Sequence, residues 1–327
     1  MQNNTYLITE WRTAQMSAIR DGVSEGLSQI SHDEKVVVIT ADLAEATRTS
    51  KFREEYPDRF FDVGVSEQNM AGIAAGLSFE GMIPFIASFA TFSPGRNWEQ
   101  IRVSIALSGA NVKIIGSHGG VATGQNGPSH QATEDIALMR VLPNMVVLVP
   151  ADANQTAVMI EAAYKYDGPV YIRTARPKVA NFTKPFDFTQ NKSFEIGKSY
   201  VYREGSDITI CACGIQVWDS LMIAEELAKE GIECEVINVC SIKPLDSETI
   251  IKSAKKTGKV ITIEDHQIVG GMGSAVGEIL SEKYPLLVKR VGIKDVFGIS
   301  GKYEEVYKKL GLDRESLKKA VVDWFHE

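Results

Sequence analysis

Two histidines fall in one glycine-rich loop that could bind a ligand. The run 115–130, IGSHGGVATGQNGPSH, leaves an expected strand at 112–116 and carries His118 and His130. In open α/β sheets, ligands bind beyond the carboxyl ends of the strands. Neither histidine has a second histidine or a carboxylate at metal-ligand spacing, so zinc is not predicted. Acid–base or anion-binding chemistry is as well supported as a purely structural, hydrogen-bonded role.

Glu67 is a second residue that could do chemistry. It lies in the run 60–76, FFDVGVSEQNMAGIAAG, where Ser66 is expected to cap a helix and an acid in the first turn suits the helix dipole. The small residues that follow allow another surface to approach the helix closely. A glutamate shielded by such a surface could protonate or hydrogen-bond a ligand nitrogen. Spacing alone leaves the capping and ligand-binding interpretations open.

The elements expected to position these residues alternate between strand and helix. Short, β-branched runs predict buried parallel strands at 36–40, 112–116, 145–149 and 169–173. Helical patterns cover 11–29, 67–79 and 152–164, and the last opens with Asp152 and Gln155 at capping-box spacing. This alternation predicts an α/β domain with a mostly parallel sheet.

The second half of the chain repeats this alternation. Strands are expected at 208–212, 233–239, 259–264 and 288–292, and helices at 217–229, 247–256 and 273–283. A mixed stretch at about 177–206 is expected to be a linker. The fold class predicted is therefore α/β, with two consecutive domains whose mostly parallel sheets are covered by helices.

The composition restricts the partners and the compartment. The 327 residues include 35 Lys and Arg against 42 Asp and Glu, a net charge of −7, with no long basic block, which disfavours nucleic acid. No apolar run approaches the roughly 20 residues that cross a bilayer, and no signal-peptide pattern opens the chain, so we expect a cytoplasmic protein without a membrane partner. The four cysteines are expected to pack in the core.

The sequence resembles the C-terminal half of transketolases over nearly its whole length. The matching stretches are WRTA (11–14), ADLA (41–44), GVSEQNM (64–70), SFATF (88–92) and GPSHQATEDIALMRVLPNMVVLVPAD (127–152). The resemblance makes 1–185 a domain that binds the pyrimidine of thiamine diphosphate and 186–327 the family's C-terminal domain.

The resemblance also implies a second chain. Transketolases bind the diphosphate through a Gly-Asp-Gly motif, which this chain lacks. A partner subunit with the diphosphate-binding domain is therefore expected to supply that site and its Mg²⁺ or Ca²⁺. The two chain types would form a heterotetramer with two copies of each, and this chain would be inactive alone.

The resemblance assigns roles to individual residues. Glu67 matches the glutamate that hydrogen-bonds the aminopyrimidine and promotes the imino tautomer that takes the thiazolium proton. Phe89 and Phe92 match aromatics that pack on the pyrimidine, and His130 matches a histidine near the reacting carbonyl. Three residues match those that hold the terminal phosphate of the sugar: Arg12, His118 and Arg176.

Three positions depart from the family pattern. Asn126 stands where transketolases often carry an aspartate that contacts a substrate hydroxyl, so this contact loses its charge. Ala46 replaces a serine of the phosphate site, and Gly95 replaces an aromatic at the pyrimidine. A modified sugar is therefore a possible substrate.

The expected reaction is transfer of a two-carbon ketol unit from a ketose phosphate, such as xylulose 5-phosphate, to an aldose phosphate, such as ribose 5-phosphate. One alternative is the β subunit of the decarboxylating component of a 2-oxoacid dehydrogenase. The sequence of the loop around His130 resembles that of transketolases instead. A second alternative is a non-catalytic assembly subunit. The presence of both Glu67 and His130 argues against it.

Overall fold

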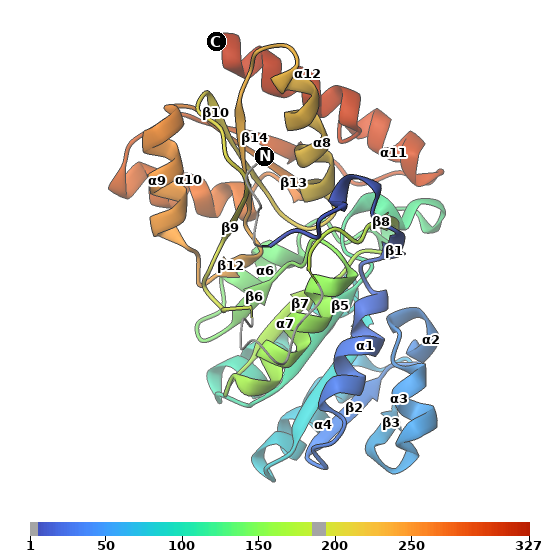
Figure 1. Cartoon of the computed structure of the whole chain (residues 1–327). Coiled ribbons are helices and arrows are strands. Elements are labelled where there is room, and N and C mark those ends of the chain that lie inside the picture. The colour runs from blue at the N-terminus through green and yellow to red at the C-terminus, as the bar shows by residue number, and fades with distance from the viewer. Residues whose placement is uncertain (1–5, 185–193) are drawn as a thin grey trace.

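The computed structural model describes residues 6–184 and 194–327, which form two α/β units (Figure 1). The first contains a seven-stranded sheet in the order β12-β6-β7-β5-β4-β2-β3. Its parallel strands are β2 (Val36–Thr40), β3 (Phe60–Asp62), β4 (Ile83–Phe89), β5 (Lys113–Ser117), β6 (Val146–Leu148) and β7 (Val170–Arg173). The edge strand β12 (Ser241–Lys243) comes from the second half of the chain and pairs antiparallel with β6.

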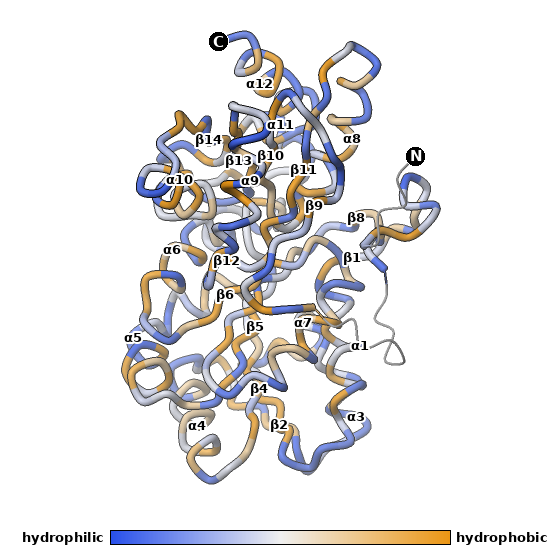
Figure 2. The backbone as a smooth tube through the Cα atoms, turned by 60° about the vertical axis from the view of Figure 1, so that its left-hand side comes forward, coloured by the Kyte–Doolittle hydropathy of each residue, from blue (hydrophilic) through white to orange (hydrophobic). Residues whose placement is uncertain are grey.

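The first sheet is buried on both faces. In β2, Val38 packs into a cluster that includes α1 (Asp21–Ile30), α3 (Ser50–Glu55) and α7 (Ala153–Lys165), whereas the next residue, Ile39, packs into a cluster with α4 (Glu67–Phe79). Figure 2 shows hydrophobic colour along β2 and β5. Runs without polar alternation are expected for strands covered on both sides.

The second unit has a five-stranded sheet in the order β14-β13-β10-β11-β9. Its strands are β9 (Tyr200–Arg203), β10 (Ile208–Ala212), β11 (Cys234–Asn238), β13 (Val260–Gln267) and β14 (Val288–Ile293). Its helices are α8 (Gln216–Ala228), α9 (Ser247–Thr257), α10 (Met272–Lys283), α11 (Tyr303–Leu310) and α12 (Arg314–His326). All four cysteines are buried and free, as predicted. No helix of the described part of the chain is long and apolar enough to cross a membrane.

The structure confirms the α/β class and the two consecutive domains. All eight strands that the sequence predicts are present, within one or two residues of their expected ends except at the end of β13. The stretch expected to be a linker contains β8 (Lys178–Ala180) and β9. The proposed boundary at 185/186 lies outside the described residues.

The helix predicted over 11–29 is wrong in its first half. The structure has a short 3-10 turn, η1 (Trp11–Thr13), then β1 (Met16–Ala18), and α1 begins only at Asp21. β1 pairs antiparallel with β8, and the Asp21 carboxylate accepts a hydrogen bond from the Ala18 N–H at 3.0 Å. A strand pairing that involves residues about 160 positions away overrides a local helical pattern.

We expect Gly22→Ala to lower the free energy of unfolding by about 2–3 kcal/mol, measured by urea denaturation. A Cβ at Gly22 would lie 2.0 Å from the Ala153 carbonyl oxygen, where α1 packs on α7. The control is Gly277→Ala in α10, where a Cβ meets nothing within 4 Å. It should raise stability by up to about 1 kcal/mol through helix propensity. Equal effects of the two substitutions would contradict the close α1–α7 packing.

Candidate functional site

Glu67 is the first residue of α4 and is 1% exposed. Its Oε1 accepts a hydrogen bond from Ser88 Oγ at 3.3 Å, and its Oε2 accepts one from Arg96 Nη1 at 2.5 Å. Ser66 occupies the N-cap position, but the predicted side-chain cap is wrong, because Ser66 Oγ donates to the Val63 carbonyl instead. The carboxylate of Glu67 is therefore held by side chains from β4 and the segment that follows it.

An aromatic wall lies beside this carboxylate. Phe89 ends β4, and its ring is stacked with that of Phe92 at a centroid distance of 6.0 Å and an interplanar angle of 20°. The Arg96 guanidinium lies 4.6 Å from the centroid of Phe92. Asn97 Nδ2 donates to the backbone carbonyl of Glu67, which ties the segment after β4 to the start of α4.

Both loop histidines reach the aromatic wall. The histidine loop, residues 118–130, leaves the carboxyl end of β5 as predicted, and the His118 ring lies 4.0 Å from that of Phe89. His130, in a 3-10 turn, lies 5.3 Å from Phe92. The structure thus brings together residues far apart in sequence. Asn126 lies exposed in the same loop, at the end of η4 (Val121–Asn126).

His118 is held neutral by its surroundings. Its Nε2 lies 3.0 Å from Arg20 Nη1, and because a guanidinium can only donate, Nε2 must accept. Nδ1 then carries the proton and donates to Ser117 Oγ at 2.9 Å. Burial first, and then the charges of Arg20, Arg176 and Arg48, lower the pKa of His118 to about 3.

Arg20, Arg48, Arg176 and His118 form what we call the cationic cluster. Burial and the neighbouring guanidinium of Arg48 lower the pKa of Arg20 to about 10. Arg48 Nε donates to Asp21 at 2.8 Å, and Arg176 Nη1 donates to the Thr123 carbonyl at 2.8 Å.

Arg20 leaves part of its donor capacity unused. Its Nη1 also donates to the carbonyl of Ala46 at 2.8 Å, but its Nε is buried without a hydrogen-bond partner in the described residues. Asp21 is the carboxylate that raises the pKa of Arg20, against the opposing charges of Arg48 and Arg176. An incoming anion would therefore find donors already desolvated and oriented.

Arg12 does not join the cationic cluster. Its Nε and Nη2 both donate to Glu225 of α8, and its guanidinium lies 4.4 Å from the Trp11 ring. It is also absent from the charges that shift the pKa of His118. The structure therefore does not bring the Arg12 guanidinium, which the resemblance assigns to the sugar phosphate, together with His118 and Arg176.

Arg20 and Arg48 were missed by sequence reasoning. Arg20 directly precedes α1, and the βα connection before a helix is a usual place for ligand-binding residues. Recognising β1 would have exposed this signal. Arg48 has a left-handed backbone, φ 65°, after the short helix α2 (Ala44–Thr47), a feature that the sequence alone does not reveal.

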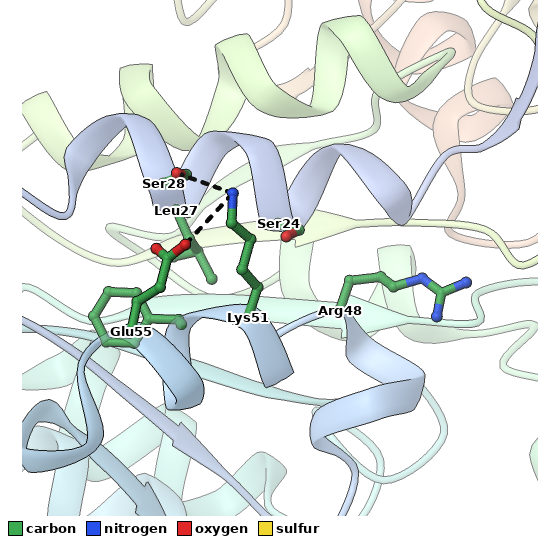
Figure 3. A pocket seen from close by; sticks show the side chains of 7 residues that line it. Ser24, Leu27, Ser28, Arg48, Lys51 and Glu55 are labelled. Atoms are coloured by element: carbon green, nitrogen blue, oxygen red, sulfur yellow. Dashed lines mark hydrogen bonds and ion pairs between the residues drawn. The ribbon is translucent and has the colours of Figure 1, made fainter.

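A hollow between α1 and α3 shares only Arg48 with this site. In Figure 3, Lys51 points toward Ser28 and Glu55, while the Arg48 side chain extends away from them. Lys51 Nζ lies 3.5 Å from Ser28 Oγ and 3.7 Å from Glu55 Oε1. The contact with Ser28 links α3 to α1, whereas the contact with Glu55 lies within α3.

A buried ionic group anchors the histidine loop to the second domain. Arg173 donates to Asp135 at 2.8 Å and to the backbone carbonyl of Asp265 at 2.8 Å. The Asp265 carboxylate in turn accepts the Val121 N–H at 3.0 Å and the Tyr307 hydroxyl at 2.7 Å. Buried charges are tolerated when they are paired and hydrogen-bonded in this way. The start of the loop is therefore fixed by residues from both domains.

The residues around Glu67 fit an aminopyrimidine ring. The planar guanidinium of Arg96 makes the two contacts that such a ring would make, because it donates to Glu67 and lies against the ring of Phe92. No cluster of three or more His, Cys, Asp or Glu side chains suited to a metal occurs among residues 6–184 and 194–327.

Comparison with known proteins identifies the family to which both units are similar. Residues 15–181 match the family "Transketolase, pyrimidine binding domain" and residues 197–317 match "Transketolase, C-terminal domain". A transketolase C-terminal section of Methanocaldococcus jannaschii is 43% identical over 93% of this chain and 95% of that protein. A 6-deoxy-6-sulfo-D-fructose transketolase subunit of Clostridium sp. strain MSTE9 is 40% identical over 90% of each. A solved split-gene transketolase, described as an inactive β4 tetramer, has 44% identity and a TM-score of 0.84, covering 94% of this chain and 98% of that one.

We expect His118 to remain neutral between pH 5 and 8, and Arg20→Met to raise its pKa toward the usual range. Removing one positive charge makes protonation easier, although burial, the larger cause, remains. An NMR pH titration of the His118 ring measures its pKa in the wild type and in Arg20→Met. The control is Arg12→Met, which should leave the titration unchanged. A wild-type midpoint near pH 6.5 would contradict the burial of His118 against the cationic cluster.

Proposed function

The chain belongs to the transketolase family, and we propose that it is the subunit of a split transketolase that contributes the pyrimidine half of a thiamine diphosphate site. The observation that carries the proposal is the buried Glu67 carboxylate beside the stacked Phe89 and Phe92. The identity with separate-chain transketolase sections, along nearly their full length, supports the same assignment.

Each residue of the proposed site has a distinct task. Thiamine diphosphate, when bound, supplies a carbon nucleophile for the carbonyl of a ketose. Glu67 would share a proton with the ring nitrogen at Oε2, while Phe89 and Phe92 would exclude water from the face of the ring. His130, beside Phe92, would donate or accept protons at the hydroxyls of the substrate.

The surface near Glu67 suits a partner chain. α4 and the π-helical segment η3 (Ile101–Leu107) contact each other, and apolar side chains in and beside them are exposed, among them Val65 at 71% and Leu107 at 73%. A Cβ added at Gly72 of α4 would meet nothing within 4 Å, so this face lies open to another backbone. We propose that a diphosphate-binding subunit covers it, supplies the diphosphate and metal sites, and completes a heterotetramer.

The cationic cluster suits a sugar with a terminal anion. We propose that it holds the phosphate of xylulose 5-phosphate or ribose 5-phosphate, or a comparable anion on a modified sugar. Arg20 and Arg48 take the place that the resemblance gave to Arg12. The relative named for a sulfonated fructose makes a sulfonate a second anion to test. Asn126, uncharged and in the same loop as His130, would contact a sugar hydroxyl.

The proposal predicts that ketol transfer needs both chains and Glu67. Xylulose 5-phosphate and ribose 5-phosphate would be supplied with thiamine diphosphate and Mg²⁺, first with this chain and then with a candidate diphosphate-domain chain. We expect activity only in the mixture, and Glu67→Gln should reduce kcat at least about a hundredfold because proton transfer is impaired. Glu80→Gln, an exposed change at the other end of α4, is the control. Full activity of Glu67→Gln would overturn the assigned role.

A second prediction separates Arg20 from Arg12. In the active mixture, Arg20→Ala should raise KM for a phosphorylated sugar about tenfold or more with a smaller effect on kcat, because a charge-assisted contact present in ground and transition states is lost. Arg12→Ala should leave KM near the wild-type value, since its guanidinium pairs with Glu225. Repeating the assay with a 6-sulfonated ketose compares the two anions. The opposite ranking of the two variants would restore Arg12 to the phosphate site.

A further inference from the structure

Arg96 makes the two contacts that the proposed function gives to the pyrimidine ring. Its Nη1 donates to Glu67 Oε2 at 2.5 Å, and its guanidinium lies 4.6 Å from the centroid of Phe92. A guanidinium, like an aminopyrimidine, is planar and presents N–H donors along its edge. The side chain therefore lies in the position where the ring would be recognised.

Glu67 has little capacity left while Arg96 is in place. Ser88 donates to Oε1, Arg96 donates to Oε2, and the Glu67 side chain is 1% exposed. A ring nitrogen could approach Oε2 along the line of the present hydrogen bond only if Arg96 withdrew. The Arg96 side chain is 45% exposed, so it can move into solvent without repacking the core.

The backbone on both sides of Arg96 is fixed, which confines such movement to the side chain. At Gly95 an added Cβ would lie 2.0 Å from the carbonyl oxygen of Thr91, so the chain passes too close there for a larger residue. On the other side, Asn97 Nδ2 donates to the backbone carbonyl of Glu67 and to Ser93 Oγ.

We propose that Arg96 competes with the aminopyrimidine for Glu67 and so sets the affinity of this chain for the cofactor. In the free chain it pairs with a buried carboxylate that would otherwise be uncompensated. Entry of the ring replaces the guanidinium by another planar group on the same two partners, with one proton shared between Glu67 Oε2 and the ring nitrogen. This inference rests on the proposed function, which makes Glu67 the ligand of the pyrimidine.

The affinity for the pyrimidine alone tests the competition without a partner chain. The probe is 4-amino-5-hydroxymethyl-2-methylpyrimidine at millimolar concentration, and binding to the full chain is measured by saturation-transfer NMR. Arg96→Ala should lower the dissociation constant about tenfold, because the competing group is gone. Arg96→Lys, which keeps the charge but lacks the planar group, should fall between. Arg102→Gln, an exposed arginine a few residues further on, should match the wild type.

The Glu67→Gln and Arg96→Ala/Glu67→Gln chains distinguish the two hypotheses. Binding that is tighter in Arg96→Ala and lost in the double variant supports the competition. Equal binding by wild type and Arg96→Ala, lost in Glu67→Gln, overturns the role of Arg96 and leaves the proposed function standing. Binding of the probe that is unchanged by Glu67→Gln contradicts the proposed function itself. If a folded Arg96→Ala chain binds no probe, the competition is also overturned, since vacating Glu67 should have opened the position.

Discussion

The negative charge of Glu67 is the feature around which the site is arranged, because a carboxylate that is 1% exposed needs compensation from the protein. The compensation comes from elements that are consecutive in the chain, namely β4 and the segment that follows it. β4 delivers Ser88 and Phe89 at its carboxyl end, and the segment after it returns Arg96 and Asn97 to the start of α4. The path of the chain from α4 through β4 to Asn97 therefore determines which side chains surround Glu67.

Around His118, which contacts Phe89 of the aromatic wall, positive rather than negative charge needs compensation. Three guanidinium groups act on His118, and the neutral imidazole, rather than a carboxylate, accepts a hydrogen bond from Arg20. Such an arrangement costs stability in the free chain, because like charges repel and the pKa of Arg20 falls. Bound anions relieve that repulsion. An excess of positive charge of this kind, with Asp21 as its carboxylate partner, is a common feature of anion-binding sites.

Local patterns predicted the parts of the fold that local physics determines. The buried strands were found because β-branched runs such as Val36–Thr40 suit a doubly covered sheet, and α4 was placed at Glu67–Phe79. The helix over 11–29 failed because β1 exists only by pairing with β8. For the same reason Arg20 was not predicted as a site residue, whereas His118 and His130 were predicted from their glycine-rich loop. Arg96 carries no sequence signal, since its role depends on a contact with Glu67, 29 positions away in the chain.

These observations show how the groups of the proposed site are paired within the chain itself. Two of the proposed recognition groups are paired with partly exposed side chains: the carboxylate of Glu67 with Arg96, and Arg48 with Asp21. The Arg48–Asp21 pair is partly exposed on both sides and contributes little net stability, whereas the buried Glu67 carboxylate needs a replacement partner whenever Arg96 withdraws. The buried anchor from Arg173 to Asp265 is different, because breaking it would leave charges uncompensated. The fold thus keeps the histidine loop rigid through buried ionic contacts and leaves the ligand-facing groups paired with side chains that can withdraw.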